Sequence, residues 1–418
     1  MKKLLVLLQA GFIVLMIGSC GKKDDGKTTL SILLGPDIGG AWKTVAKRFE
    51  EKHPDISIDI IEGSQSTNSR EDLYTTSFLS GESSYDLVYM DIVWLPKFTA
   101  QGWLLPLDKY FTNDAQKDFL PGDMAGSRYK GSTYRVPMQT DAGMLYYRKD
   151  LLDKAGFKPP KTWEELLKIA KKLQKPPELW GFVFQGKQYE GVVCDYLELL
   201  WGNNGKWVDE NDNVHINSPQ AIEALSWLAD ALHKHKISPP GVSTYEEEEA
   251  RLLFQEGRAV FMRNWPYAWV LAQGKDSPIK GKVGIIPMVH GKNGKSAGTL
   301  GGWGVGIAAT SKHHDEAWKF IEFASSQESL KTFHFTGGMT PTRKSLFKDP
   351  EVLKKSPHYK DLYKVLMVAR PRPPVPYYAK ISDILQVAIS LAMSGDKSAK
   401  KALEAAEKET KKVIEQVR

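Results

Sequence analysis

Cysteine is scarce in this chain, where only Cys20 and Cys194 occur among 418 residues. Cys20 directly follows an apolar N-terminal stretch, so Cys194 has no second cysteine with which to form an internal disulfide. Cys194 itself lies in the apolar run VVCDYLELL. We therefore expect a buried structural thiol at Cys194 and no internal disulfide.

Apolar runs long enough to span a membrane are also missing. Residues 2–3 are lysines, and the apolar stretch that follows at 4–17 is shorter than the ~20 residues that a spanning helix needs. Small residues then lead into Cys20, which completes the pattern of a secretion signal. The sequence Ile-Gly-Ser-Cys at 17–20 resembles the bacterial lipobox, which implies cleavage before Cys20 and lipidation of Cys20. We therefore predict an exported protein that is lipid-anchored to the cell membrane, on its extracytoplasmic face or in the periplasm. Its first segments would be a signal peptide at 1–19 and a tether at 20–29.

Motifs typical of catalysis and metal binding are absent as well. The sequence has no GxSxG nucleophile elbow, its histidine pairs at 233/235 and 313/314 lack metal-ligand context, and GTLGGWGVG lacks the ending of a phosphate loop. The formal net charge is +7, but basic residues are scattered and mostly alternate with acidic ones. Such a pattern is typical of solvated helix faces. We predict no catalytic residue, metal, cofactor or nucleic-acid partner, whereas attraction to an anionic membrane surface stays open.

Strands alternate with helices through the part of the chain that follows the signal. Apolar strand patterns at 30–34, 56–61 and 85–90 are separated by helical patterns at 42–53 and 70–79. A second α/β region begins near Val136, and its helix WEELLKIAKKL is preceded by Thr162, with Glu165 placed for a capping box. This alternation predicts an α/β fold with mostly parallel sheets covered on both faces, and the chain length favours two or three domains.

Carboxylates and aromatic residues gather where we predict that strands end. Asp91 follows one predicted strand and Asp141 precedes another, and the predicted loops RNWPYAW and GGW carry Trp265, Tyr267 and Trp303. Ligands bind at the carboxyl ends of strands in such sheets. Carboxylates accept two hydroxyl groups at once, and flat aromatic faces suit the apolar faces of sugar rings. These residues therefore favour a carbohydrate site, although a helix cap or turn for each aspartate and a core position for each tryptophan remain alternatives.

At these motifs the sequence resembles the extracellular sugar-binding proteins of ABC importers, and within them the trehalose/maltose-binding proteins. The matching stretches are MDIVWLPKFTAQGWLLPLD, TDAGMLYYRKDLL, WGFVFQGKQYEGVVCDY, FMRNWPYAW, TLGGW and PRPPVPYY. The resemblance implies a periplasmic-binding-protein-like fold with two lobes and a ligand cleft between them. We expect residues 30–138 with 304–343 in one lobe and 140–299 with 344–418 in the other. Carried over to this chain, the ligand-binding residues are Arg70, Asp91, Asp141, Trp265, Tyr267, Gly302, Trp303 and Arg372.

The resemblance implies a monomeric receptor that captures a disaccharide and delivers it to the permease subunits of an ABC importer. Two departures leave trehalose, maltose and related α-glucosides open. The first strand–helix loop, GPDIGGAW, has no clear match to an acidic residue of the relatives, and Gln139 stands where they have a tyrosine. The alternative function is a secreted glycoside hydrolase that uses Asp91 and Asp141, because paired carboxylates beside aromatic platforms also describe glycosidase clefts.

Overall fold

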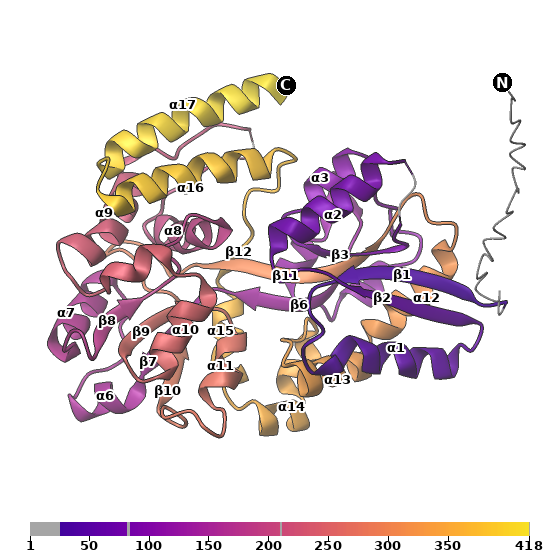
Figure 1. Ribbon diagram of the computed structural model, residues 1–418, viewed down its shortest axis with the longest axis horizontal. Helices are drawn as coiled ribbons and strands as arrows, with labels where there is room; N and C mark the ends of the chain where they lie inside the picture. Colours follow the sequence, from indigo (N-terminus) through magenta and orange to yellow (C-terminus); the bar gives the residue numbers. More distant parts are fainter. Residues whose placement is uncertain (1–25, 82–83, 210, 418) are drawn as a thin grey trace, which may run out of the picture.

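Two β-sheets, each covered by helices on both faces, form the two halves seen in Figure 1. The computed structural model describes residues 26–81, 84–209 and 211–417. The first sheet has the strand order β12-β11-β3-β1-β2, with β6 added beside β11, and the second has the order β10-β7-β9-β8. The chain thus folds into two α/β lobes.

The first sheet is mixed, with a parallel part and an antiparallel part. β1 pairs in parallel with both β2 and β3, whereas β11 runs antiparallel to β3 and β6 and parallel to β12. The strands are β1 (Thr28–Leu34), β2 (Ile56–Glu62), β3 (Leu87–Asp91), β6 (Val136–Ala142), β11 (Gly298–Ile307) and β12 (Ala369–Arg370). A separate hairpin is formed by β4 (Arg128–Tyr129) and β5 (Ser132–Thr133).

Alternation along β1 and β3 gives the first sheet an apolar core on each face. Leu30, Ile32 and Tyr89 face the cluster that includes Trp42 and Phe49, whereas Leu33 and Val88 face the cluster of Tyr74 and Phe98. The first cluster is covered by α1 (Ala41–Lys52), α12 (His314–Ala324) and α13 (Gln327–Gly337), and the second by α2 (Thr67–Leu79) and α3 (Leu95–Ala100). The short helices α4 (Asn113–Gln116) and α5 (Pro121–Ala125) follow.

The second sheet is built in the same way. Its strands are β7 (Met144–Arg148), β8 (Trp180–Val183), β9 (Ala259–Asn264) and β10 (Val283–Ile286). One face packs on α7 (Trp163–Leu173), α8 (Glu190–Gly202) and α9 (Pro219–His233), and the other on α10 (Glu247–Gln255) and α11 (Tyr267–Ala272). The predicted capping box of Thr162 and Glu165 at the start of α7 is confirmed. Helix α6 (Lys149–Lys154) follows β7.

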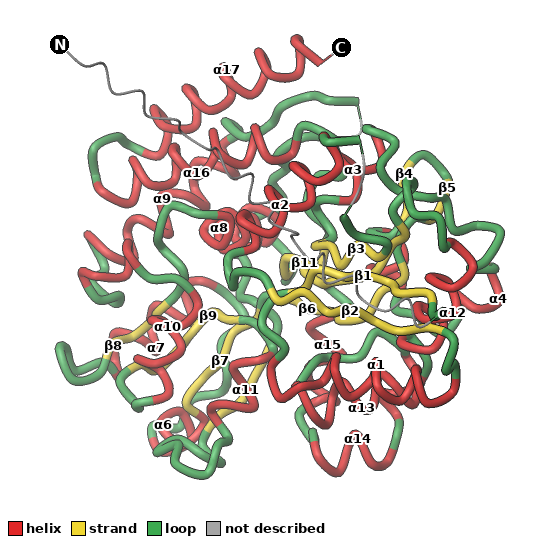
Figure 2. Tube along the Cα trace, turned by 45° about the vertical axis from the view of Figure 1, so that its right-hand side comes forward, coloured by secondary structure: helices red, strands yellow, loops and turns green. Residues whose placement is uncertain are grey.

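The C-terminal region packs on both halves. Helix α14 (Pro350–Lys355) is tied to α13 by the ion pair of Lys331 with Asp349, whereas α15 (Tyr359–Leu366) packs on β10, β6 and β11. Helices α16 (Tyr378–Ser394) and α17 (Ala399–Val417) lie side by side against α8 and α9 (Figure 2). The exact lobe boundaries given above stay a prediction.

Two sequence predictions about local structure are wrong, and a third is incomplete. The strand predicted after Asp141 is present as β7, but Asp141 itself lies inside β6. Trp303 lies inside β11 and not in a loop. Glycines are depleted in strands, so the glycine-rich GTLGGWGVG favoured a loop, but pairing with three other strands holds this segment extended. The segment RNWPYAW is not one loop, because Tyr267 begins α11.

The predicted signal peptide and lipidation site fall before residue 26, where the described part of the chain begins. The signal peptide at 1–19 and the lipidation site Cys20 lie outside the described residues. Between Gly26 and Val417, leaving out 82–83 and 210, no helix is long and apolar enough to cross a membrane. The buried position of Cys194, without a disulfide, is confirmed.

Candidate functional site

Trp303 occupies the middle of β11, where the two lobes meet, and is half-buried among aromatic rings. Its ring stacks on Tyr89 at a centroid distance of 5.1 Å and meets Trp94 edge-on at 5.3 Å. The guanidinium carbon of Arg70 lies 4.4 Å from the ring centroid, which is a cation–π geometry. Trp303 is therefore held rigidly, as a stacking platform needs to be.

Arg70 reaches this position from α2, and the first turn after β1 makes room for it. A Cβ atom on Gly35 would lie 1.8 Å from Nη1 of Arg70, so only glycine permits this approach. Arg70 is 8% exposed, and its burial lowers the pKa of the guanidinium below the ordinary value for arginine. In the same turn, the carboxylate of Asp37 accepts hydrogen bonds from the backbone N–H groups of Trp42 and Lys43, in the first turn of α1.

Asp91 ends β3 directly opposite Trp303 in the ladder and connects the first lobe to the C-terminal region. Its Oδ1 accepts from Nη2 of Arg372 at 3.3 Å, while Nη1 of Arg372 donates to Glu190 at 2.7 Å. Tyr378 donates to the same Glu190 oxygen at 2.5 Å. Glu190 opens α8 in the second lobe, so Arg372 bridges carboxylates that come from both lobes.

Asp141 lies on the other strand that runs between the lobes, β6. Its Oδ2 accepts a hydrogen bond of 2.8 Å from the amide of Gln139. Burial raises the pKa of Asp141 to about 8, and the nearby charges of Asp123 and Asp91 act in the same direction.

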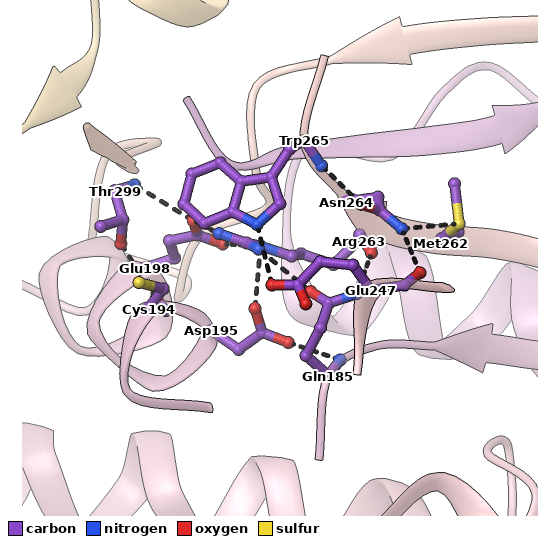
Figure 3. Close-up of polar contacts among 10 residues, drawn as sticks. All are labelled: Gln185, Cys194, Asp195, Glu198, Glu247, Met262, Arg263, Asn264, Trp265 and Thr299. Carbon is purple, nitrogen blue, oxygen red and sulfur yellow. Dashed lines mark hydrogen bonds and ion pairs between the residues drawn. The ribbon is translucent and has the colours of Figure 1, made fainter. Parts of the chain in front are cut away.

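Trp265 follows β9 and lies next to Asp141 through the gap left by Gly301, whose Cβ would lie 3.2 Å from Asp141 and 3.4 Å from Trp265. The guanidinium carbon of Arg263 lies 4.1 Å from the centroid of the Trp265 ring. The indole N–H donates to Glu247 at 3.3 Å, and Tyr146 donates to the Trp265 carbonyl at 2.7 Å. The ring is thus fixed on several sides, as Figure 3 shows for Arg263 and Glu247.

Arg263 belongs to a buried ionic network beneath this ring (Figure 3). Its Nε lies 2.9 Å from Asp195, and its Nε and Nη2 both donate to Glu198, so one cation pairs with two carboxylates. All three side chains are at most 3% exposed. Burial opposes the charge of Arg263, but Asp195 and Glu198 raise its pKa, while burial raises the pKa of Asp195 well above its usual range.

The two remaining predicted residues, Tyr267 and Gly302, make contacts within the protein. The hydroxyl of Tyr267 donates to Glu248 at 2.7 Å. Gly302 has a φ of +121°, which side-chain-bearing residues rarely adopt, and its carbonyl accepts from the backbone N–H of Ile92 and from Arg135, each at 3.1 Å. That carbonyl is therefore already engaged, and the role of Gly302 toward a ligand stays a prediction.

The structure thus brings several of the predicted residues together around the middle of β11. Arg70, Asp91 and Arg372 gather at Trp303, and Asp141 and Trp265 gather at Gly301. Sequence analysis missed the groups that hold them, namely Glu190, Glu247 and the Arg263 network. Charged residues inside otherwise apolar runs such as VVCDYLELL and AVFMRN were the available signal, because a buried charge needs a partner. The described residues contain no group of three or more His, Cys, Asp or Glu that could hold a metal ion.

Comparison with known proteins shows the family. The bacterial extracellular solute-binding protein family matches residues 35–331. The chain belongs to this family. A probable ABC transporter-binding protein of Deinococcus radiodurans is 36% identical over 80% of this chain and 81% of its own length. The maltose-bound MalE3 of T. maritima is 40% identical, covers 92% of this chain and all of its own, and superimposes with a TM-score of 0.86. A mannitol-binding protein of Pseudomonas aeruginosa is 26% identical over 88% of each chain.

The predicted fold class is confirmed by these relatives and by the two lobes described above. An exported, extracytoplasmic protein is what membership of an extracellular family implies. The ligand-binding role of the eight predicted residues stays a prediction.

Proposed function

We propose that this protein is the receptor of an ABC importer for a disaccharide of the maltose and trehalose type, and that it is not a hydrolase. The observation that carries the proposal is the convergence of stacking rings, carboxylates and guanidinium groups from both lobes on one strand, β11. Aromatic faces match the C–H faces of glucose rings, and carboxylates accept pairs of hydroxyl groups. The 40% identity to a maltose-bound structure supports a disaccharide as the ligand. The mannitol-binding relative indicates that members of the family also bind smaller polyols.

The same geometry supports binding rather than hydrolysis. A glycosidase needs one carboxyl group free to act as an acid and another as a base or nucleophile. Asp91 is instead paired with Arg372 and Asp141 with Gln139, so each is oriented by a donor. A receptor uses such oriented carboxylates to accept hydroxyl groups. The partners of this receptor would be the permease subunits of an importer, and we expect the receptor itself to act as a monomer.

Calorimetric titration of the mature protein with maltose and trehalose tests this function. We expect one disaccharide to bind at a single site and to be recovered intact, because donors of the chain hold both Asp91 and Asp141. Glucose and mannitol serve as controls of ligand size. If mannitol binds and no disaccharide gives a heat of binding, the ligand is not a disaccharide. If glucose is released from maltose, the protein is a hydrolase and not a receptor.

Lipid anchoring at Cys20 is a separate proposal, which rests on the sequence Ile-Gly-Ser-Cys at 17–20. Replacing Cys20 with alanine should move the protein from the membrane fraction to the soluble fraction or leave it unprocessed, because the thiol that carries the lipid is gone. Replacing Cys194 with alanine is the matched control, since that thiol is buried. An unchanged distribution of Cys20→Ala between fractions would contradict the anchor.

A further inference from the structure

A cavity lies on the face of β6 and β11 that is turned away from the proposed sugar site. Side chains alternate across a strand, and Gln139 and Asp141 of β6 are joined to each other on the side of Trp265. Thr140 and Leu300 point to the opposite side, where a Cβ on Gly122 would lie 3.1 Å from Leu300. This space, which we call the α5 cavity, is therefore separated from the sugar site by the two strands.

The α5 cavity measures about 230 Å³ and has two kinds of wall. Asp123 and Thr140 form the polar wall, and the apolar wall is made by Leu120, Leu300, Leu366 and Met367. Met367 is 55% exposed, so the cavity reaches the protein surface at this residue. A water molecule takes about 30 Å³ of the liquid, so the cavity has room for a small organic molecule.

The polar wall is unsatisfied. Asp123 and Thr140 are both fully buried, and within the described residues no hydrogen bond of normal length and angle reaches either oxygen of Asp123 or the hydroxyl of Thr140, although that hydroxyl lies close enough to lower the pKa of Asp123. Burying a carboxylate without well-placed donors is costly, so a further donor in this cavity would stabilise Asp123.

One cation, Arg135, acts on Asp123 through its charge. Burial raises the pKa of Asp123 to about 7, and Arg135 opposes that shift through its charge. Arg135 donates through Nη1 to the carbonyl of Gly302 and through Nε to Ser127, while its Nη2 has no hydrogen-bond partner within the described residues, so Arg135 acts on Asp123 by charge and not by a hydrogen bond. Asp141 lies across the strands, β11 has no titratable side chain, and Arg370 of β12 is exposed. No other charge therefore faces Asp123 from the elements packed on it.

We propose that the α5 cavity is a second binding site, whose ligand is a small primary ammonium compound with a short apolar chain. The ammonium group has three N–H donors, enough for both oxygens of Asp123 and for the hydroxyl of Thr140. The hydrocarbon chain fills the space between Leu120, Leu300 and Leu366 and leads out past Met367. Because β6 and β11 also carry Asp141 and Trp303, the ligand sits directly behind the strands that hold the sugar site.

Methyl NMR of the mature protein, labelled with ¹³C at its methionine methyl groups, tests the site with n-butylammonium as the probe. We expect a saturable shift of the Met367 resonance, which is assigned by its loss in Met367→Leu. Asp123→Asn keeps the shape of the side chain and removes its charge. This variant should bind n-butylammonium at least tenfold more weakly. Asp114→Asn is the matched control, because Asp114 is an exposed residue on α4. Butyrate, which has the opposite charge, should not bind.

The pH dependence separates this site from a merely apolar pocket. The probe needs the ionised carboxylate, so its affinity should fall about tenfold from pH 8 to pH 6 as Asp123 takes up a proton, and Asp123→Asn should show no such change. A Met367 resonance that does not respond would mean that the cavity holds only water. Equal binding of n-butanol, unaffected by Asp123→Asn, would mean hydrophobic filling only. Either result overturns the proposal, and since no sugar is present, neither bears on the sugar receptor.

Discussion

Replacing Arg263 with methionine is expected to destabilise the protein by about 3–5 kcal/mol, because the change leaves two buried carboxylates without their cation. Asp195 and Glu198 are 3% and 0% exposed, so water cannot replace the lost guanidinium. Methionine fills a similar length of space, which makes loss of charge rather than loss of volume the main effect. Thermal and urea unfolding of the ligand-free protein measure the change.

Two further variants make this test specific. Lys43→Ala removes an ion pair whose partners are 63% and 41% exposed, and it should shift the melting temperature little. Combining Arg263→Met with Glu198→Gln should recover part of the lost stability, because one of the unpaired charges is then removed. If Arg263→Met is as stable as the wild type, or if the double variant is no better than the single one, the network does not have this role.

The Arg263 network also connects stability to the proposed function. Glu198 accepts from the backbone N–H of Thr299 at 3.1 Å, at the start of β11, and Arg263 lies under the Trp265 ring. One buried cluster therefore fixes a strand that runs between the lobes and a proposed stacking platform. This explains why charged residues occur in strand and helix segments that are otherwise apolar.

Much of the fold could be predicted because its signals are local. The strand β1 is an apolar run, the sequence of β2 alternates apolar and polar residues, α1 has an apolar stripe, and Thr162 with Glu165 marks the start of α7. Helix α8 gave no such signal, since it is buried all round and its apolar residues show no helical period. β11 was only partly recognised, because its extended form depends on partners far away in the sequence.

The candidate site was foreseeable only as a set of residue types. The sequence indicated which aromatic rings and carboxylates could serve a sugar, but it could not place Arg70 on Trp303 or pair Arg372 with Asp91. Those contacts join residues more than 200 positions apart, and their geometry follows from the packing of both lobes. For the same reason, the structural engagement of the Gly302 carbonyl by Arg135 could not be anticipated.

Replacing Trp303 with alanine is expected to weaken disaccharide binding by about tenfold to a hundredfold, because it removes a rigid stacking face. The structure adds a second effect, since Trp303 also packs on Tyr89 and Trp94 and supports the guanidinium of Arg70. The melting temperature of the ligand-free protein should therefore fall as well. Calorimetric titration with maltose, together with melting in the absence of sugar, measures the two effects separately.

Trp103→Ala is the matched control for this packing effect. Trp103 is a half-buried tryptophan of the same aromatic cluster and stacks on Phe78 at 5.1 Å, but it lies outside the proposed site. Its loss should lower the melting temperature and leave affinity unchanged, whereas Trp303→Phe should keep a stacking face and lose less affinity than Trp303→Ala. If Trp303→Ala merely repeats the behaviour of Trp103→Ala, with normal affinity in a less stable protein, then Trp303 is a core residue and β11 does not carry the sugar platform.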